Sequence, residues 1–381
     1  MELGLYIHYP YCLSKCPYCD FNSHVAKAID VHDLTKAYIN ELAFYQNLIQ
    51  KNFVIKTIFF GGGTPSLMDK KLLTNILEHI KNNYNLAEDI EITLEANPST
   101  IENDKIKFFR DVGINRISLG VQSFDDDVLK FLGRKHDVKT AINALDNIQK
   151  YFSNFSLDLI YGIHNQDLNA WNDNLTTAFK FNSNHISLYQ LTIEKGTEFY
   201  RRYNKDQLQL MNDDLQADLY DFTYEKAAKF GYNRYEISNF AKSGFESKHN
   251  LNYWRSGDYI GIGAGAHSRL NVKNQRYGFI NYHKPEKWCQ NAILGNAVQN
   301  KEIISQETEI EEYLMMGLRL KDGINLLDFK QKFQQDLLSF VNKEQLNKLI
   351  NDNFLMLDNN RLVIEKSSFK LTNNILAKIL T

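Results

Sequence analysis

Short apolar segments rich in β-branched residues recur along the first half of the chain, and amphipathic segments separate them. Strands are expected at residues 3–8, 56–60, 90–95, 116–120, 157–161 and 186–191. Apolar residues at steps of three and four predict helices between them, including residues 34–49, 70–84 and 139–152. Strand alternating with helix predicts βαβ units and a parallel sheet. The spacing is typical of a (β/α) barrel, and a doubly wound sheet is the competing topology.

The pattern changes after about residue 213. A helix at residues 213–230 precedes a strand expected at 234–238 and a glycine-rich segment at 259–268. Further helices are expected at residues 309–319, 326–333 and 343–351. Apolar segments on both sides of Asn359 and Asn360 predict a short hairpin. Helices followed by a hairpin predict a small, winged-helix-like domain in the last part of the chain.

Composition excludes several classes of protein. The chain has 381 residues, a formal net charge of -2, 43% hydrophobic residues and 24% charged residues. This balance is typical of a globular protein and excludes a disordered chain. A near-neutral charge argues against a nucleic-acid partner, which would require a basic surface. No apolar run is long enough to cross a membrane, and the first residues lack the features of a signal peptide, so a cytoplasmic location is expected.

Three of the four cysteines lie close together in the sequence. Cys12, Cys16 and Cys19 fall within eight residues, whereas Cys289 stands alone and is expected to be a packing residue. Such a cluster in a reducing compartment indicates metal binding rather than disulfides. Three thiolates can hold three irons of a [4Fe–4S] cluster and leave the fourth iron open to another ligand. The alternative is a structural zinc loop in which His24 joins the three cysteines.

Polar or glycine-rich segments follow the next expected strands. Gly61-Gly-Gly-Thr-Pro65 follows the second strand, Glu95 ends the third, and Gln122 ends the fourth. In barrel proteins, the carboxyl ends of the strands are where ligands bind. These residues are therefore expected to lie near the cysteines.

The Cys-x3-Cys-x2-Cys loop directly after a first strand, together with these segments, resembles the radical S-adenosylmethionine (SAM) superfamily. More narrowly, the chain is similar to the oxygen-independent coproporphyrinogen III oxidase family, and within it to the heme chaperone branch. Further matching segments are Asp158-Leu-Ile-Tyr-Gly162, His185-Ile-Ser-Leu-Tyr189, Tyr235-Glu-Ile-Ser-Asn-Phe-Ala241, His249-Asn-Leu-Asn-Tyr-Trp254 and Gly263-Ala-Gly-Ala-His267. The resemblance implies an α/β fold with an incomplete (β/α)6 barrel over residues 1–235, a linking region over 236–304 and a helical domain over 305–381.

The resemblance also implies roles for individual residues. Cys12, Cys16 and Cys19 would ligate a [4Fe–4S] cluster. The residues that would line the SAM pocket are Tyr6, Tyr18, Phe21, Gly63, Thr64, Glu95, Gln122, Arg134 and Asp158. Arg134 could pair with the methionine carboxylate of SAM, and Glu95 could accept hydrogen bonds from its amino or hydroxyl groups.

Two positions depart from the family pattern. Phe21 stands where the oxidases carry a fourth cysteine, which favours the chaperone branch. Gly162-Ile-His-Asn-Gln166 stands where the family usually has Gly-Leu-Pro-Gly-Gln, which affects the loop after Asp158.

Heme and an acceptor protein, such as a respiratory heme protein, are the partners that the resemblance implies. His249 lies in the His-Asn-x-x-Tyr-Trp motif of the chaperone branch and is the expected iron ligand, with Tyr253 and Trp254 as apolar faces for a porphyrin. The alternative is that His249 holds a neighbouring loop, and His267 is then the next candidate ligand. Two rival functions remain: a decarboxylase acting on a porphyrinogen in porphyrin biosynthesis, and a zinc-stapled binding module.

Overall fold

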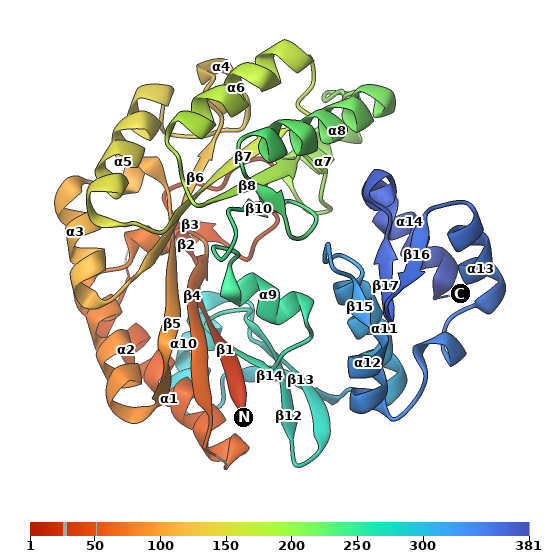
Figure 1. Ribbon diagram of the computed structural model, residues 1–381. Coiled ribbons are helices and arrows are strands. Elements are labelled where there is room, and N and C mark those ends of the chain that lie inside the picture. The colour runs from red at the N-terminus through yellow and green to blue at the C-terminus, as the bar shows by residue number, and fades with distance from the viewer. Residues whose placement is uncertain (26–28, 51, 381) are drawn as a thin grey trace.

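The computed structural model describes residues 1–25, 29–50 and 52–380. Six parallel strands, hydrogen-bonded in chain order, form the centre of the molecule (Figure 1). They are β1 (Glu2–Tyr9), β4 (Val54–Gly62), β5 (Asn85–Ala96), β6 (Arg116–Gln122), β7 (Phe155–Tyr161) and β8 (His185–Gln190). The six strands predicted from the apolar segments are therefore confirmed.

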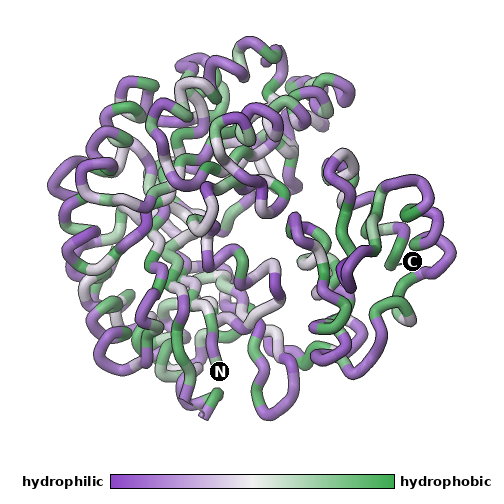
Figure 2. Tube along the Cα trace, viewed as in Figure 1, coloured by the Kyte–Doolittle hydropathy of each residue, from purple (hydrophilic) through white to green (hydrophobic). Residues whose placement is uncertain are grey.

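Helices follow most of these strands and cover the outer face of the sheet (Figure 1). They are α1 (Val31–Ile49), α2 (Lys70–Asn83), α3 (Asn103–Val112), α4 (Asp126–Phe131), α5 (Val138–Tyr151), α6 (Leu168–Lys180), α7 (Glu198–Tyr203) and α8 (Asp213–Lys229). Strands and inner helix faces are hydrophobic, and the outer helix faces are hydrophilic (Figure 2). This burial between two layers accounts for the helical periodicity in the sequence.

The sheet remains open. The described strands give the order β14-β13-β12-β11-β1-β4-β5-β6-β7-β8-β10-β9, so its two edges are not joined. From β1 to β8 each new strand is added on the same side, which is barrel topology and not the doubly wound alternative. The incomplete (β/α)6 barrel is confirmed.

Strands of the predicted linking region continue the same sheet. β11 (Tyr259–Ile262) pairs with β1 in parallel, and β12 (His267–Val272), β13 (Gln275–Asn281) and β14 (Val298–Ile303) follow as antiparallel strands. The helices of this region are α9 (Lys248–Trp254) and α10 (Pro285–Ile293). The region thus adds a wall beside the open side of the barrel.

The strand predicted at residues 234–238 is wrong. β9 (Asn233–Arg234) and β10 (Asn239–Ala241) are two short antiparallel strands, and the residues between them form a turn. The Glu236 carboxylate accepts a hydrogen bond from the backbone N–H of Ser238 at 3.2 Å, which closes that turn. A side chain bonding to nearby backbone is a local interaction that an apolar pattern does not reveal.

The last part of the chain has a hydrophobic core of its own, formed by residues between Ile310 and Ile379. Its helices are α11 (Gln306–Gly317), α12 (Leu326–Phe333), α13 (Lys343–Asn351) and α14 (Thr372–Ile379). A small sheet contains β15 (Ile324–Asn325), β17 (Arg361–Ile364) and β16 (Leu355–Asp358). The hairpin predicted around Asn359 and Asn360 is confirmed, and both residues have the positive φ that such a tight turn requires.

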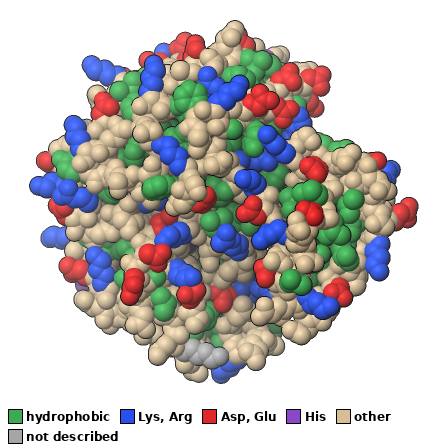
Figure 3. Space-filling view, in the orientation of Figure 1, with side chains coloured by type: hydrophobic (Ala, Val, Ile, Leu, Met, Phe, Trp, Pro, Cys, Tyr) green, Lys and Arg blue, Asp and Glu red, His purple; other side chains and the backbone are tan. Residues whose placement is uncertain are grey.

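Several side chains connect this C-terminal domain to the rest of the molecule. Arg269 of β12 pairs with Glu312 of α11 at 3.0 Å. At the other end, the guanidinium of Arg234 lies 3.7 Å from the ring centroid of Phe369. Charged side chains of both signs lie along the junction of the two domains on the face shown in Figure 3. None of the described helices combines the length and the apolar character needed to cross a lipid bilayer.

Candidate functional site

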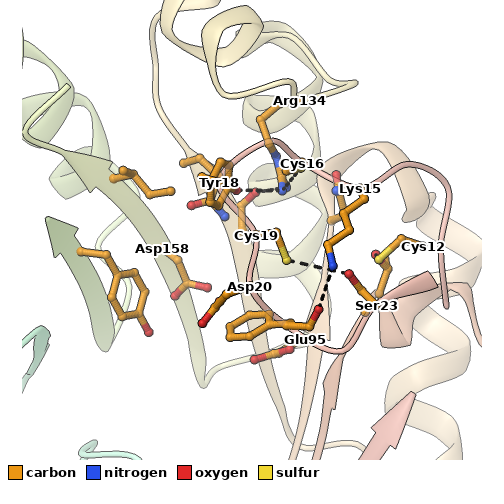
Figure 4. A pocket seen from close by; sticks show the side chains of 18 of the residues that line it. Cys12, Lys15, Cys16, Tyr18, Cys19, Asp20, Ser23, Glu95, Arg134 and Asp158 are labelled. Carbon is orange, nitrogen blue, oxygen red and sulfur yellow. Dashed lines mark hydrogen bonds between the residues drawn. The ribbon is translucent and has the colours of Figure 1, made fainter. Parts of the chain in front are cut away.

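The three clustered cysteines lie on one loop at the carboxyl end of β1 (Figure 4). The short strands β2 (Tyr11–Cys12) and β3 (His24–Val25) pair with each other and close this loop at its base. Within the loop, the N–H of Cys19 donates to the carbonyl of Cys16 at 3.1 Å. The loop therefore holds its three thiols in a compact turn between two paired strands.

The spacing of the sulfur atoms bears on the metal that the loop could hold. Asp30, His32 and Asp33 form the only group of three or more ligand atoms within 4.8 Å of one another in the described parts of the chain. The three cysteine sulfurs therefore spread wider than this, even with His24 included. Tetrahedral zinc–sulfur bonds of about 2.3 Å would bring sulfur ligands to within about 4 Å of each other. At least two of these sulfurs would therefore have to move closer together to share a single zinc ion.

The thiols lie in a partly buried environment. Thr64 Oγ1 donates to the sulfur of Cys12 at 3.4 Å, and the sulfur of Cys19 lies 3.9 Å from the hydroxyl of Ser23. Burial raises the pKa of both thiols. They therefore carry their protons at neutral pH until a metal displaces them.

A cavity of about 330 Å³ opens beside the cysteine loop (Figure 4). Besides the three cysteines, eight of the nine residues predicted for the SAM pocket line it: Tyr18, Phe21, Gly63, Thr64, Glu95, Gln122, Arg134 and Asp158. Tyr6 is the exception. Its ring lies beneath Gly61 and its hydroxyl contacts Nδ1 of His8 at 2.9 Å, so it lines other cavities.

Arg134 is held against the cysteine loop. Its Nη1 lies 3.7 Å from the sulfur of Cys16 and 3.4 Å from the hydroxyl of Tyr18, and its Nη2 donates to the carbonyl of Gly120 at 2.9 Å. Its buried Nε has no hydrogen-bond partner among the residues that the structure describes. A buried guanidinium nitrogen without a hydrogen-bond partner destabilises the folded protein. The carboxylate of a ligand could accept that hydrogen bond.

Two carboxyl groups form the floor of this cavity. Burial, and secondarily the charge of Asp158, raise the pKa of Glu95 to about 8. Burial also raises the pKa of Asp158, although serine hydroxyls oppose the shift, including that of Ser118 at 3.2 Å. Two neighbouring, partly buried carboxyl groups favour a ligand that brings hydrogen-bond donors or positive charge.

Gln122 has an unusual backbone conformation at the end of β6. Its φ of 69° lies in the left-handed region, which is costly for a residue with a side chain. Its amide group lies against Gly120, where an added Cβ would come within 2.6 Å of Nε2. Strain of this kind concentrates at ligand-binding positions.

The unusual loop after Asp158 is well formed. The side-chain oxygen of Gln166 accepts the N–H of Gly162 at 2.9 Å, and both residues are buried. Asn165, which stands where the family usually has glycine, has a φ of 65°. Because asparagine tolerates the left-handed region better than most residues, this substitution preserves the turn.

A second and larger cavity, of about 1180 Å³, lies between the barrel, the strands β11–β13 and α11. Phe21, Glu95 and Tyr189 line both cavities, so the two adjoin. Residues that line it and were not singled out from the sequence include His283 and Met316. Arg319 also lines it and lies in Gly317-Leu-Arg-Leu320, a further segment that resembles the family. No motif marks His283 or Met316, and the fold brings them together from distant parts of the chain.

His249 does not line the larger cavity, and both of its ring nitrogens have hydrogen-bond partners. The residue is 1% exposed. Its Nδ1 lies 2.8 Å from the hydroxyl of Thr57, and its Nε2 lies 2.9 Å from the hydroxyl of Tyr253. Tyr253 and Trp254 do line the larger cavity. Iron ligation by His249 stays a prediction, and it would require one of these two hydrogen bonds to break.

Comparison with known proteins agrees with this geometry. The model of the radical SAM superfamily matches residues 6–177, and that of the HemN C-terminal domain matches residues 304–367. The fold and the three-cysteine loop are thus those of a radical SAM protein. This superfamily is defined by a [4Fe–4S] cluster and SAM.

Similarity to individual proteins narrows the family. The chain is 35% identical over 379 residues to the heme chaperone HemW of Lactococcus lactis, covering 98% of this chain and 96% of that protein. It is 42% identical to the Escherichia coli HemW over 86% of this chain and 85% of that protein. The chain belongs to the HemW family. The solved coproporphyrinogen III oxidase (HemN) of Escherichia coli shares the fold, with a TM-score of 0.81 at 20% identity over 99% of this chain and 89% of that one.

Proposed function

We propose that this protein binds heme and passes it to an acceptor protein. The observation that carries the proposal is the cavity of about 1180 Å³ that adjoins the three-cysteine pocket. Its volume exceeds that of most small-molecule sites, which suits a ligand as large as a porphyrin. Its wall includes the aromatic residues Tyr253, Trp254 and Tyr259, against which a flat macrocycle could pack. Relatives named heme chaperones support the same function.

We further propose that Cys12, Cys16 and Cys19 ligate one [4Fe–4S] cluster. The position of the three cysteines on one loop between two paired strands and the match to the radical SAM superfamily support this assignment. The cluster, when bound, supplies an open iron that coordinates SAM and one-electron chemistry. The protein contributes a closed loop and a partly buried pocket around it.

Exchangeable SAM would occupy the cavity of about 330 Å³. The unpartnered Nε of Arg134 would meet the methionine carboxylate. Glu95 and Asp158 would accept hydrogen bonds from the amino and hydroxyl groups of SAM. Gln122 would contact the ligand from the end of β6, where its strained backbone already fixes its position. Thr64 and Gly63 would form the wall beside Cys12.

A titration and a transfer assay test the proposed function. Anaerobically reconstituted protein is titrated with hemin, and the heme-loaded protein is then mixed with an apo heme protein of known spectrum. Saturable binding near one heme per chain, followed by appearance of the acceptor's spectrum, is the expected result. Absence of saturable binding would refute the proposal.

A matched control separates heme binding from the cluster. The Cys12→Ala variant should lose the cluster and still bind hemin, since the two proposed sites use different residues. Conversion of coproporphyrinogen III by the reconstituted wild-type protein would instead support the porphyrinogen decarboxylase.

A further inference from the structure

The larger cavity contains exposed histidines whose nitrogens are free, in contrast to His249. Both His267, at the start of β12, and His283, just after β13, are exposed and line the cavity. Neither ring makes a hydrogen bond within the described parts of the chain. An imidazole needs a free nitrogen lone pair to bind iron. His267 and His283 therefore have the free ring nitrogen that iron ligation requires, and His249 does not.

The side chain of His267 projects toward the C-terminal domain. Residues at every second position of a strand share a face, so His267 and Arg269 lie on the same side of β12. Arg269 reaches Glu312 of α11 at 3.0 Å. The buried residues Ser268 and Leu270 mark the opposite face. His267 thus faces the wall that α11 forms.

Two ion pairs determine how α11 lies along β12. Arg276, which is paired with Asn271 of β12, approaches Glu309, and Arg269 contacts Glu312. Glu309 therefore lies level with Asn271 of β12, and Glu312 lies level with Arg269, which precedes Asn271 in that strand. The helix and the strand run in opposite directions, so the next turn of α11 lies level with His267.

Met316 occupies that next turn on the same helical face. It lies seven residues after Glu309 and four after Glu312, spacings that place all three side chains on one side of a helix. Met316 lines the cavity. A thioether sulfur is a common axial ligand of heme iron opposite an imidazole. His267 and Met316 therefore face each other across the cavity at one level.

A cation for the carboxylate groups of heme lies beside Met316. Arg319 is one turn further along α11, lines the cavity and has no carboxylate within 4.0 Å among the residues that the structure describes. Its guanidinium donates to the side-chain oxygen of Asn373 at 2.8 Å and to the carbonyl of Met315. A propionate of heme would give this guanidinium a direct ion-pair partner, whereas the carboxyl group of Glu236 acts on it only from beyond 4.0 Å.

We propose that heme iron is bound by His267 of β12 and Met316 of α11, with a propionate on Arg319, and not by His249. This assignment rests on the proposed heme-binding function and specifies its ligands. It places the iron between the barrel extension and the C-terminal domain. Separation of these two walls would remove one ligand, which provides a route for handing heme to an acceptor.

Hemin titrations of the full-length protein test the assignment. His267→Ala should convert the low-spin ferric spectrum to a high-spin one and raise the Kd for hemin by about tenfold or more. Met316→Leu should keep the imidazole ligand and lose the thioether charge-transfer band of the ferric state. His32→Ala removes an exposed histidine outside the cavity and should match wild type. His249→Ala should retain the wild-type heme spectrum, with circular dichroism confirming that it is folded.

The possible outcomes separate the two proposals. A changed spectrum in His249→Ala or in His283→Ala, with His267→Ala unchanged, would overturn the assignment to His267 and leave heme binding intact. Changed spectra in both His267→Ala and a folded His249→Ala would overturn the exclusion of His249. An unchanged ferric spectrum in Met316→Leu would overturn the assignment to Met316. Absence of saturable hemin binding by wild-type protein would refute the proposed function itself.

Discussion

The hydroxyl of Thr57 on β4 lies 2.8 Å from Nδ1 of His249 on α9, 192 residues further along the chain. The other ring nitrogen, Nε2, contacts the hydroxyl of Tyr253 at 2.9 Å, and the ring stacks on Phe59 with centroids 5.0 Å apart. Burial lowers the pKa of His249 to about 3, so the ring is neutral in the physiological range. In this arrangement His249 joins α9 to the barrel.

His249→Ala should lower the free energy of unfolding by at least about 2 kcal/mol, because it breaks two buried hydrogen bonds and leaves their partners unsatisfied. Thr57→Val is the matched variant: it removes one of the two bonds and should cost about 1 kcal/mol. Urea denaturation under anaerobic conditions measures both. Equal stability of His249→Ala and wild type would argue against a structural role.

Replacing Cys12, Cys16 or Cys19 with alanine should abolish the broad iron–sulfur absorbance of the reconstituted protein. Each substitution removes one of the three proposed ligands, and the partly buried loop has no fourth cysteine to take its place. Iron and sulfide analysis with absorbance spectra provides the measurement. Cys289→Ala is the control, because Cys289 lies on α10 outside that cavity. Loss of the cluster in that variant would imply a fourth protein ligand.

The reconstituted wild-type protein should not decarboxylate coproporphyrinogen III. Phe21 is 57% exposed and lines both cavities at the position where the oxidases carry a fourth cysteine. Anaerobic incubation with SAM, a reductant and substrate, followed by chromatography of the porphyrins, provides the test. Robust formation of protoporphyrinogen would make this protein an oxidase and contradict the chaperone assignment.

Substitutions at Gln122 test whether its strained backbone conformation serves SAM binding. Gln122→Gly should raise the free energy of unfolding by about 1 kcal/mol, since glycine adopts the positive φ without steric cost. The same variant should bind SAM more weakly. Gln122→Ala retains the strain while removing the amide group, so it should lose SAM affinity without gaining stability. Thermal unfolding and SAM titration of the cluster-loaded protein distinguish these effects, and full SAM affinity in both variants would exclude Gln122 from the pocket.

The carboxyl group of Glu41 should make the free energy of unfolding depend on pH. Its buried carboxylate joins α1 to the wall beside the barrel, accepting hydrogen bonds from Gly263 at 3.0 Å, from Trp288 at 2.9 Å and from Asn281. Burial raises its pKa from 4.5 to about 8. Between these values the folded protein holds a proton that the unfolded chain has released, so the free energy of unfolding should fall as pH rises.

The slope that Glu41 contributes is about 1.4 kcal/mol per pH unit for one proton. Glu41→Gln should remove one such contribution between about pH 5 and pH 8. Glu95, whose pKa is also raised to about 8, should retain its own contribution in that variant. Denaturation curves at several pH values measure the slope, and an unchanged slope in Glu41→Gln would show that the carboxyl group ionises normally.

Much of the cysteine pocket follows from the sequence alone. Cys12, Cys16 and Cys19 are close in the chain, so one loop necessarily brings them together. Glu95 and Gln122 end parallel strands, and parallel strands place their carboxyl ends at one edge of a sheet. The alternation of strands and helices likewise determined a parallel sheet covered by helices, because each element must bury one apolar face. Only the observed strand order distinguishes the barrel from a doubly wound sheet.

Only the tertiary structure decided the environment of His249 and the route of the chain at residues 235–238. The resemblance of its motif to that of the chaperone branch implies that His249 is a heme ligand, yet Thr57 and Tyr253 contact both of its ring nitrogens. The alignment of His267 with Met316 likewise depends on ion pairs between β12, β13 and α11. Such contacts join residues that are distant in the chain, and their register follows from packing rather than from local pattern.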